Sequence, residues 1–120
     1  IVINSAADGV AIGTGGINQA RIAKAWVNFN GTGTVAIRDS YNVGSITDNG
    51  AGTYTVNFST AMTNANYCCN MNSGDKAVVW GIPLFDGPST FLAGSCKIVV
   101  QHPNDTPTDN PIVCASFFGN

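Results

Sequence analysis

The sequence predicts an all-β domain, an antiparallel β-sandwich of jelly-roll-like form with about eight strands. Strong helix formers are scarce, because the chain has no Glu and only two Leu, Leu84 and Leu92. Short segments alternate apolar and polar residues, which is typical of strands that bury one face. Fourteen Gly and seven Asp supply turn residues between these segments.

The first regular strand is expected at residues 23–30, and a Gly-Thr-Gly turn at residues 31–33 leads to a second strand at residues 34–38. Two strands joined in this way form a hairpin. Trp26 falls on the otherwise polar face of the first strand. The side chains expected to point inward from the two strands are Ala25, Val27, Phe29, Val35 and Ile37.

A third strand is expected at residues 41–47, where the alternation slips near Gly44. Tyr41 and Val43 share one parity, whereas Ile46 has the other. Such a slip predicts a β-bulge, because one extra residue turns all later side chains to the opposite face.

The loop at residues 48–52 is rich in Asn and Gly, which tolerate positive φ. It leads to the most regular strand of the chain, residues 53–58, in which Tyr54, Val56 and Phe58 share one face. The remaining strands are expected at residues 67–71, 76–82, 96–101 and 112–118. Long loops are expected at residues 83–94 and 102–111.

Residues 76–82 and 112–118 are apolar on both faces, although a single sandwich buries only one face of each sheet. Charged residues make up 10% of the chain, against roughly 25% in a typical globular domain. We therefore expect a homotypic interface that covers the surplus apolar surface. Its residues are expected to include Trp26, Val78, Trp80 and Phe117.

The chain of 120 residues predicts one domain at residues 20–120, preceded by a Gly-rich lead-in segment or edge strand at residues 1–19. Because it begins with Ile and shows no signal peptide, we expect a fragment, a processed chain or the ordered part of a longer protein. The net charge of −2 argues against a nucleic-acid partner. The apolar stretches are too short for membrane insertion.

Side chains that could carry catalysis are few. The one histidine, His102, lies near Asp105 and Asp109 in a Pro-rich stretch whose residues are typical of turns rather than of a catalytic triad. No Cys-x-x-Cys spacing indicates zinc, and no regular spacing of Asn and Asp indicates a calcium loop. The sequence therefore predicts no enzyme activity, no cofactor and no metal site.

Four cysteines occur, and two of them, Cys68 and Cys69, are adjacent. Adjacent residues point to opposite faces of a strand. We expect free, buried thiols in a protein that folds in a reducing cytosol, and the alternative is a disulfide framework in a secreted domain.

Several short motifs run through the first half of the chain. They are AKAWVNFNGTGT at residues 23–34, ITDNG at 46–50, YTVNF at 54–58, AM at 61–62 and ANY at 65–67, and the chain ends with FFGN at 117–120. In combination they resemble a domain near the C-terminal end of tail-fibre and related structural proteins of tailed bacteriophages. The resemblance is close over about half of the chain and weakens across residues 68–109.

The resemblance implies a virion protein, made in the host cytoplasm, that forms a homotrimer and ends a tail fibre. Residues 1–19 would then be a junction with the fibre shaft or an edge strand. The implied function is host-cell attachment, with a host cell-surface glycan or protein and other virion proteins as partners. Two alternatives are a purely structural virion part, such as a capsid decoration or fibre cap, and a bacterial lectin-like carbohydrate-binding module.

Receptor contacts are expected in the two long loops, because loops carry variable contacts on a rigid scaffold. Exposed aromatic side chains there would stack on sugar rings or anchor protein contacts. The candidate receptor-binding residues are Trp80, Phe85, Phe91, His102 and Asp105.

Overall fold

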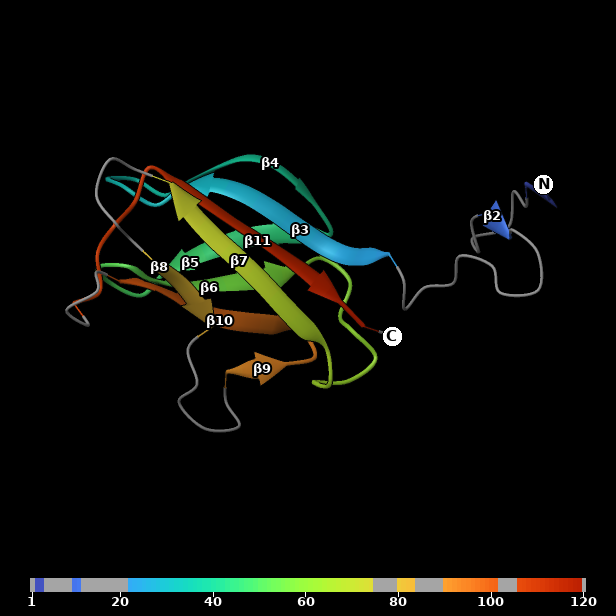
Figure 1. The fold of residues 1–120 in the computed structure, drawn as a ribbon. Coiled ribbons are helices and arrows are strands. Elements are labelled where there is room, and N and C mark those ends of the chain that lie inside the picture. Colours follow the sequence, from blue (N-terminus) through green and yellow to red (C-terminus); the bar gives the residue numbers. More distant parts are fainter. Residues whose placement is uncertain are drawn as a thin grey trace.

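The computed structural model describes residues 2–3, 10–11, 22–74, 80–83, 90–101 and 106–119, with only the backbone at 2–3, 10–11 and 80–83. Two antiparallel sheets pack against each other in this part of the chain (Figure 1). No helix occurs among the described residues. The predicted all-β antiparallel sandwich is therefore confirmed.

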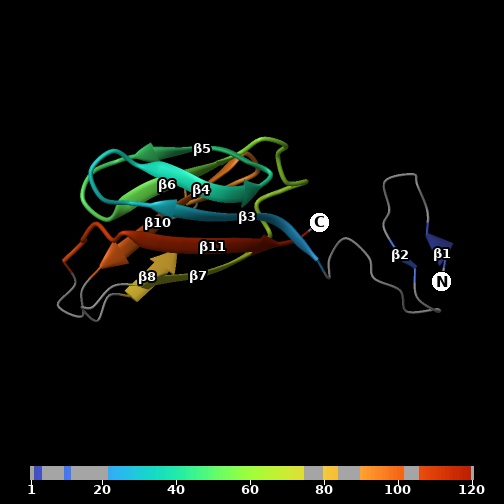
Figure 2. The ribbon, with the colours of Figure 1, turned by 90° about the horizontal axis from the view of Figure 1, so that it is seen from above.

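The first sheet contains the first and last strands of the sandwich side by side (Figure 2). Its order is β4 (Ala36–Tyr41), β3 (Ala23–Asn30), β11 (Ile112–Phe118) and β7 (Cys68–Gly74). Such a pairing of chain ends is typical of Greek-key connections in sandwiches.

The second sheet packs against the inner face of the first. Its order is β5 (Val43–Asp48), β6 (Thr53–Phe58), β10 (Ser95–Gln101) and β8 (Trp80–Pro83), and the short β9 (Phe91–Leu92) also pairs with β10. Within residues 1–19, β1 (Val2–Ile3) and β2 (Val10–Ala11) form a two-stranded sheet of their own.

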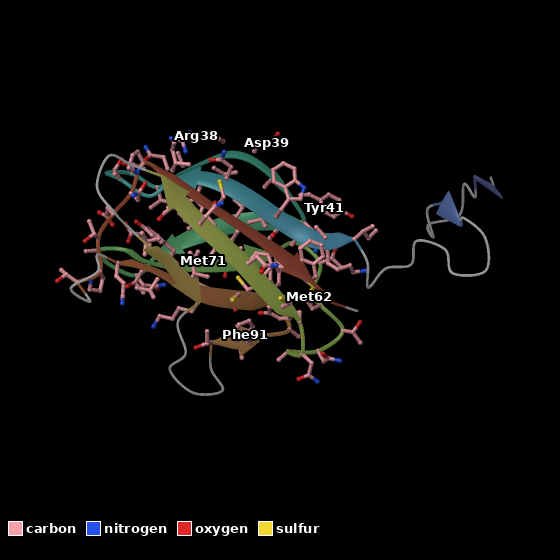
Figure 3. All side chains as sticks on the ribbon, viewed as in Figure 1. Arg38, Asp39, Tyr41, Met62, Met71 and Phe91 are labelled. Atoms are coloured by element: carbon pink, nitrogen blue, oxygen red, sulfur yellow. The ribbon has the colours of Figure 1, made fainter. Side chains whose placement is uncertain are left out.

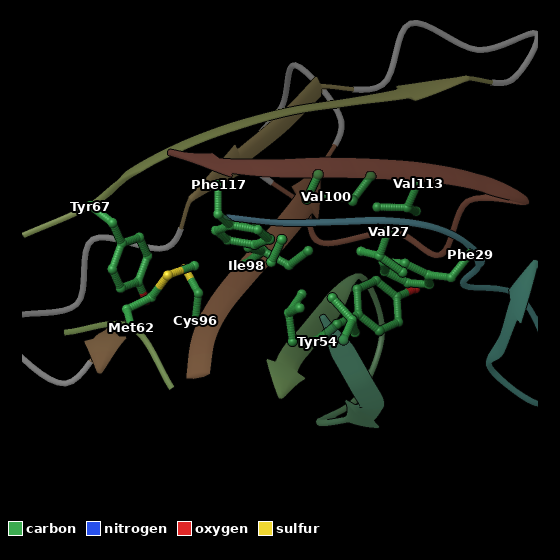
Figure 4. Close-up of a cluster of buried hydrophobic side chains, with 14 residues drawn as sticks. Val27, Phe29, Tyr54, Met62, Tyr67, Cys96, Ile98, Val100, Val113 and Phe117 are labelled. Atoms are coloured by element: carbon green, nitrogen blue, oxygen red, sulfur yellow. The ribbon is translucent and has the colours of Figure 1, made fainter. Parts of the chain in front are cut away.

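The core lies between the two sheets, where alternate residues of each strand point inward (Figure 4). Aromatic rings meet edge to face in it, with ring centroids 5.1 Å apart for Phe29 and Tyr54 and 4.9 Å apart for Phe58 and Phe117. Edge-to-face pairs of this kind add stability beyond the burial of area. The largest fully buried apolar residues are Tyr54, Phe29, Phe117, Ile98, Val27, Val56, Val100 and Val113.

Three strands have the bounds that the alternation predicted: β3, β6 and β11. Their inward residues are buried because each strand lies inside a sheet and has a partner on both sides. The predicted strand at residues 67–71 begins at Cys68 and continues to Gly74, since β11 pairs along its full length.

The second strand of the hairpin differs from the prediction. The register between β3 and β4 shifts between Asn28 and Phe29, which leaves Arg38 as an extra residue in a bulge. With this bulge Ile37 lies directly opposite the buried Phe29, on the inward side as predicted, but it stays 37% exposed, and β4 is the edge strand of its sheet. Val35, just before β4, does pack against the core as expected.

The predicted third strand is divided between the two sheets at Asn42. Tyr41 ends β4 in the first sheet, whereas Val43 begins β5 in the second and is buried. The slip predicted near Gly44 is confirmed, because the register between β5 and β6 shifts between Val43 and Ser45. Tyr41 and Val43 therefore do not share a face, although their parity predicts it.

Asn42 forms the corner between the sheets with a left-handed backbone, φ 55°. Its Nδ2 donates to the carbonyl oxygens of Lys24 at 3.1 Å and Thr60 at 3.0 Å. Its Oδ1 accepts from the Thr60 amide at 2.7 Å, and its own carbonyl accepts from the Ser59 amide at 3.1 Å. Asn is among the few residues that adopt this conformation readily. Asn42 therefore tolerates the left-handed backbone of the corner and also stabilises the corner through its side-chain hydrogen bonds.

Candidate functional site

Most of the predicted receptor-binding residues lie outside the part of the chain that the structure describes. These are Phe85, His102 and Asp105, together with the side chain of Trp80. The predicted interface residue Val78 lies outside it as well. These roles stay predictions.

Phe91 is the member of the receptor-binding set whose side chain the structure describes (Figure 3). It is half-buried and packs against the core, with its ring centroid 5.2 Å from that of Tyr67. Its neighbour Leu92 is exposed. A role of Phe91 in receptor binding stays a prediction, and its position means that truncation would also change the core.

Phe117 does not have the surface position expected of an interface residue. Its side chain is 0% exposed and packs against Phe58 and Tyr67 in the core of its own subunit. A side chain that its own fold already covers offers no surface to another subunit. Of the two predicted interface residues whose side chains the structure describes, Trp26 is the exposed one.

Trp26 lies on the outer face of the first sheet, where two rows of side chains cross all four strands. The aromatic row contains Tyr41, Trp26, Ser116 and Asn70, one from each strand in sheet order. The amide row contains Asp39, Asn28, Cys114 and Asn72 in the same order. Trp26 is 38% exposed and Tyr41 57% exposed. Two exposed aromatic rings thus occupy directly opposite positions on neighbouring strands.

A trough of about 310 Å³ follows the outer face of β11. Its floor is low because β11 contributes the small side chains of Cys114 and Ser116. Its walls rise where β3 contributes Trp26 and β7 contributes Asn70 and Asn72. Neighbouring strands lie about 4.8 Å apart, so the two walls are separated by about 10 Å. We call this hollow the β11 trough.

The polar groups of the β11 trough are largely unused within the fold. Arg38 donates from Nη1 to Asn28 Oδ1 at 3.2 Å and from Nη2 to the Pro111 carbonyl at 2.6 Å. The bond from Arg38 uses Oδ1 of Asn28, so Nδ2 of Asn28 can still donate to a ligand. Among the described residues, no hydrogen bond involves the side chains of Asn72 or Ser116.

The outer face of the second sheet is also polar, but its side chains bond to one another. Asn57 Nδ2 donates to Ser45 Oγ at 3.1 Å and to Thr47 Oγ1 at 2.9 Å. Asn49 Nδ2 donates to Thr55 Oγ1 at 2.8 Å. The two outer faces therefore differ in their hydrogen bonding: the described side chains of the second sheet bond to one another, whereas several on the first sheet, such as Asn72 and Ser116, have no described partner.

Asparagine residues within strands are a sequence signal for this face. Asn is depleted in strands, yet Asn28, Asn70 and Asn72 occupy outward strand positions. The outward position of Trp26 was predicted, but its neighbours on β7 and β11 depend on register, which the alternation within one strand does not give.

A second hollow borders the Asn42 corner and continues the polar surface past Tyr41. Its volume is about 470 Å³, and its lining includes Lys24, Tyr41, Thr60 and Thr63. Tyr41 thus lies beside this hollow and opposite Trp26 of the β11 trough.

All four cysteines are free thiols in the structure: Cys68, Cys69, Cys96 and Cys114. Cys68 is exposed and Cys69 packs against the core, as expected for adjacent strand residues. The interaction with the Cys96 thiol, followed by burial, raises the pKa of the Cys69 thiol, which keeps it protonated and unreactive.

Among the described residues, no group of three or more His, Cys, Asp and Glu side chains is placed to hold a metal ion. The described part also contains no helix that is long and apolar enough to cross a membrane. Comparisons with protein-family models, with curated proteins and with solved structures found no match.

Proposed function

We propose that this chain is a host-attachment domain of a phage virion, at the tip of a tail fibre or in a related receptor-binding protein. The observation that carries the proposal is the outer face of the first sheet, where two exposed aromatic rings adjoin amide and hydroxyl groups that the fold leaves unused. The resemblance of residues 23–67 and 117–120 to phage tail-fibre domains supports the same reading.

The chemistry of this face suits binding better than catalysis. The side chains that line the β11 trough include an indole, three amides, a hydroxyl and a thiol, and no carboxylate or imidazole is among its lining residues. General acid–base catalysis needs a group that changes its protonation near the working pH. Amides and aromatic rings instead give directional contacts and buried apolar area.

We further propose that the domain acts as a homotrimer in the virion, after synthesis in the host cytoplasm. Three copies of a shallow site would bind a repetitive surface far more tightly than one copy, because each later contact forms within the same complex. Light scattering of the purified domain should show a mass of three subunits. A monomer at micromolar concentration would contradict the trimer but leave attachment open.

A lectin-like carbohydrate-binding module is the second candidate, since the same aromatic and amide face favours it. In a purely structural virion part, a neighbouring subunit would cover this face. Fluorescently labelled domain, incubated with a panel of bacterial species, separates these candidates. We expect saturable binding to cells of a host species, and we expect excess domain to reduce infection by the phage that carries it. If the domain binds no cells, and if a neighbouring subunit covers the outer face of the first sheet in the intact particle, the domain is a purely structural virion part.

A further inference from the structure

We propose that the β11 trough is a saccharide site that takes one neutral pyranose ring against Trp26, with the next ring of the glycan extending toward Tyr41. This inference rests on the proposed attachment function and names its ligand. It differs from the expectation drawn from the sequence, which placed receptor contacts in the loops at residues 83–94 and 102–111.

The aromatic row supplies the apolar part of such a site. Trp26 forms one wall of the trough, and its indole is partly exposed. The C–H groups on one face of a pyranose ring are apolar and pack on an aromatic ring, while the ring hydroxyls point to the sides. Tyr41, directly opposite Trp26 on β4, extends this surface beyond the trough.

The amide row supplies the polar part. A saccharide hydroxyl both donates and accepts, and an Asn side chain offers both functions from one group. Asn72 lies across the trough from Asn28, with Cys114 between them on β11. The side chains of Asn72 and Ser116 make no hydrogen bond to described residues, and Asn28 keeps its Nδ2 while its Oδ1 accepts from Arg38, so a ligand can bind these groups without breaking an internal hydrogen bond.

The charge of the site argues for a neutral ligand. The trough itself is lined by uncharged groups. Lys24, two residues before Trp26 on β3, lines the neighbouring hollow beside Tyr41 rather than the trough. Beside the amide row the cation is Arg38, which already donates to Asn28 and to the Pro111 carbonyl. Asp39, at the β4 end of the amide row, accepts from the Ser40 amide at 2.9 Å and adds negative charge to that edge. An anionic sugar would thus meet a carboxylate and a cation that is already engaged.

The size of the trough is consistent with one or two rings. Its volume of about 310 Å³ is at the lower end of small-ligand sites, which run from about 300 to 1,000 Å³. The open form and few contacts predict weak binding of a single ring, and a disaccharide that reaches Tyr41 should bind more tightly. Weak single-site affinity is compatible with function because a trimer multiplies it.

The test is a titration of isotope-labelled domain, in its native oligomeric state, with neutral monosaccharides and their disaccharides. The probes are glucose, galactose, mannose and N-acetylglucosamine. We expect one or more of them to shift the indole N–H signal of Trp26 and the side-chain amide signals of Asn28, Asn70 and Asn72. Replacement of Trp26 by Phe identifies the indole signal and, by keeping an aromatic wall, should retain part of the binding.

Two variants should remove binding while the fold stays intact. Trp26→Ala should weaken it by at least about tenfold, as expected for a central aromatic contact. Asn72→Ala should weaken it without touching the apolar wall. The matched control is Asn57→Ala, which removes an outward amide from the second sheet and should bind like the parent. Melting temperature is recorded for each variant.

Several results would overturn the saccharide site. One is that no neutral probe shifts these signals although the domain binds cells, which leaves attachment standing and assigns it elsewhere. Another is that only anionic saccharides bind and Arg38→Gln abolishes their binding. A third is that Trp26→Ala converts the oligomer to monomer, which makes this face an interface between copies. Saccharide binding without attachment to any cells would support the site and contradict the proposed function.

Discussion

The hydroxyl group of Tyr54 lies 2.8 Å from Oδ1 of Asp109, although 55 residues separate them along the chain. The same hydroxyl lies 2.9 Å from the carbonyl oxygen of Gly31, and Asp109 Oδ1 also accepts from the Gly52 amide at 2.8 Å. A Cβ at position 31 would collide with this hydroxyl, so Gly31 makes the close approach possible. The contact joins three loops at one end of the sandwich and fixes the start of β11, which forms the floor of the trough.

Replacing Tyr54 with Phe should destabilise the domain by about 1–3 kcal/mol, because the single hydroxyl proton no longer satisfies an acceptor in this buried contact. The ring and its packing on Phe29 are retained. The free energy of unfolding, measured by urea denaturation, tests this. Tyr41→Phe removes an exposed hydroxyl and should change stability by less than about 0.5 kcal/mol. Equal effects of the two changes would show that the hydroxyl of Tyr54 contributes little.

Alkaline pH should destabilise the domain through the same residue. Burial, followed by the hydrogen bond and charge of Asp109, raises the pKa of Tyr54 above its usual range. Burial also raises the pKa of Tyr67. Since an unfolded Tyr ionises near pH 10, the unfolded state loses its proton first, and stability falls as the pH rises above about 10. Unfolding curves between pH 8 and 12 should show a smaller fall for Tyr54→Phe than for the parent. An identical fall would contradict this role of Tyr54.

Two substitutions at Asn42 separate the contribution of its side-chain hydrogen bonds to stability from that of its left-handed backbone. Asn42→Ala removes the side-chain hydrogen bonds to Lys24 and Thr60. It also leaves a residue at φ 55° that has a Cβ but no side-chain hydrogen bond to stabilise this conformation, so we expect the free energy of unfolding to fall by about 2–4 kcal/mol. Asn42→Gly relieves the backbone strain and should cost about 1 kcal/mol less. Asn64→Ala is the control, because it removes only one exposed local hydrogen bond, from the Asn66 amide to Asn64 Oδ1. A glycine variant less stable than the alanine variant would show that the corner is not strained.

Thiol reactivity should follow the positions of the four cysteines. All are free, so denatured protein without reductant should titrate as about four thiols per chain. In the native protein Cys68 should react first because it is exposed, and Cys69 and Cys96 last because they face each other across the core. Finding almost no thiol after denaturation would indicate disulfides. Rapid reaction of Cys96 in the native state would indicate that the core opens.

The sequence predicted the fold where a strand has a clear alternation and a turn at each end. Residues 23–30 and 53–58 meet these conditions and have the observed bounds, and the predicted bounds of residues 112–118, which are apolar on both faces, are also observed. The bulge at Arg38 and the corner at Asn42 could not be predicted in this way, because each depends on how a segment meets another strand or sheet. Parity alone therefore gave Tyr41 and Val43 the same face, although they belong to different sheets.

The candidate site was predictable in part. The outward position of Trp26 follows from its strand, and the structure adds which residues lie beside it. Asn70 and Asn72 reach the β11 trough only because β7 pairs with β11, a contact between segments about 45 residues apart that no local pattern specifies. The general tendency of loops to carry binding residues predicted receptor contacts at residues 83–94 and 102–111. The contacts among the described residues instead favour a binding site on a sheet face.

Cell binding by face-specific variants tests the account most directly. Labelled domain is applied to cells of a species that the parent binds, and bound fluorescence is measured against concentration. The double variant Trp26→Ala with Asn72→Ala, on the first sheet, should bind at least about tenfold more weakly. The double variant Thr55→Ala with Asn57→Ala, on the second sheet, loses three side-chain hydrogen bonds and some stability but should bind like the parent. Both variants are compared at a temperature at which they are folded and keep the oligomeric state of the parent. Undiminished binding by the first variant, or loss of binding by the second, would contradict attachment through the outer face of the first sheet.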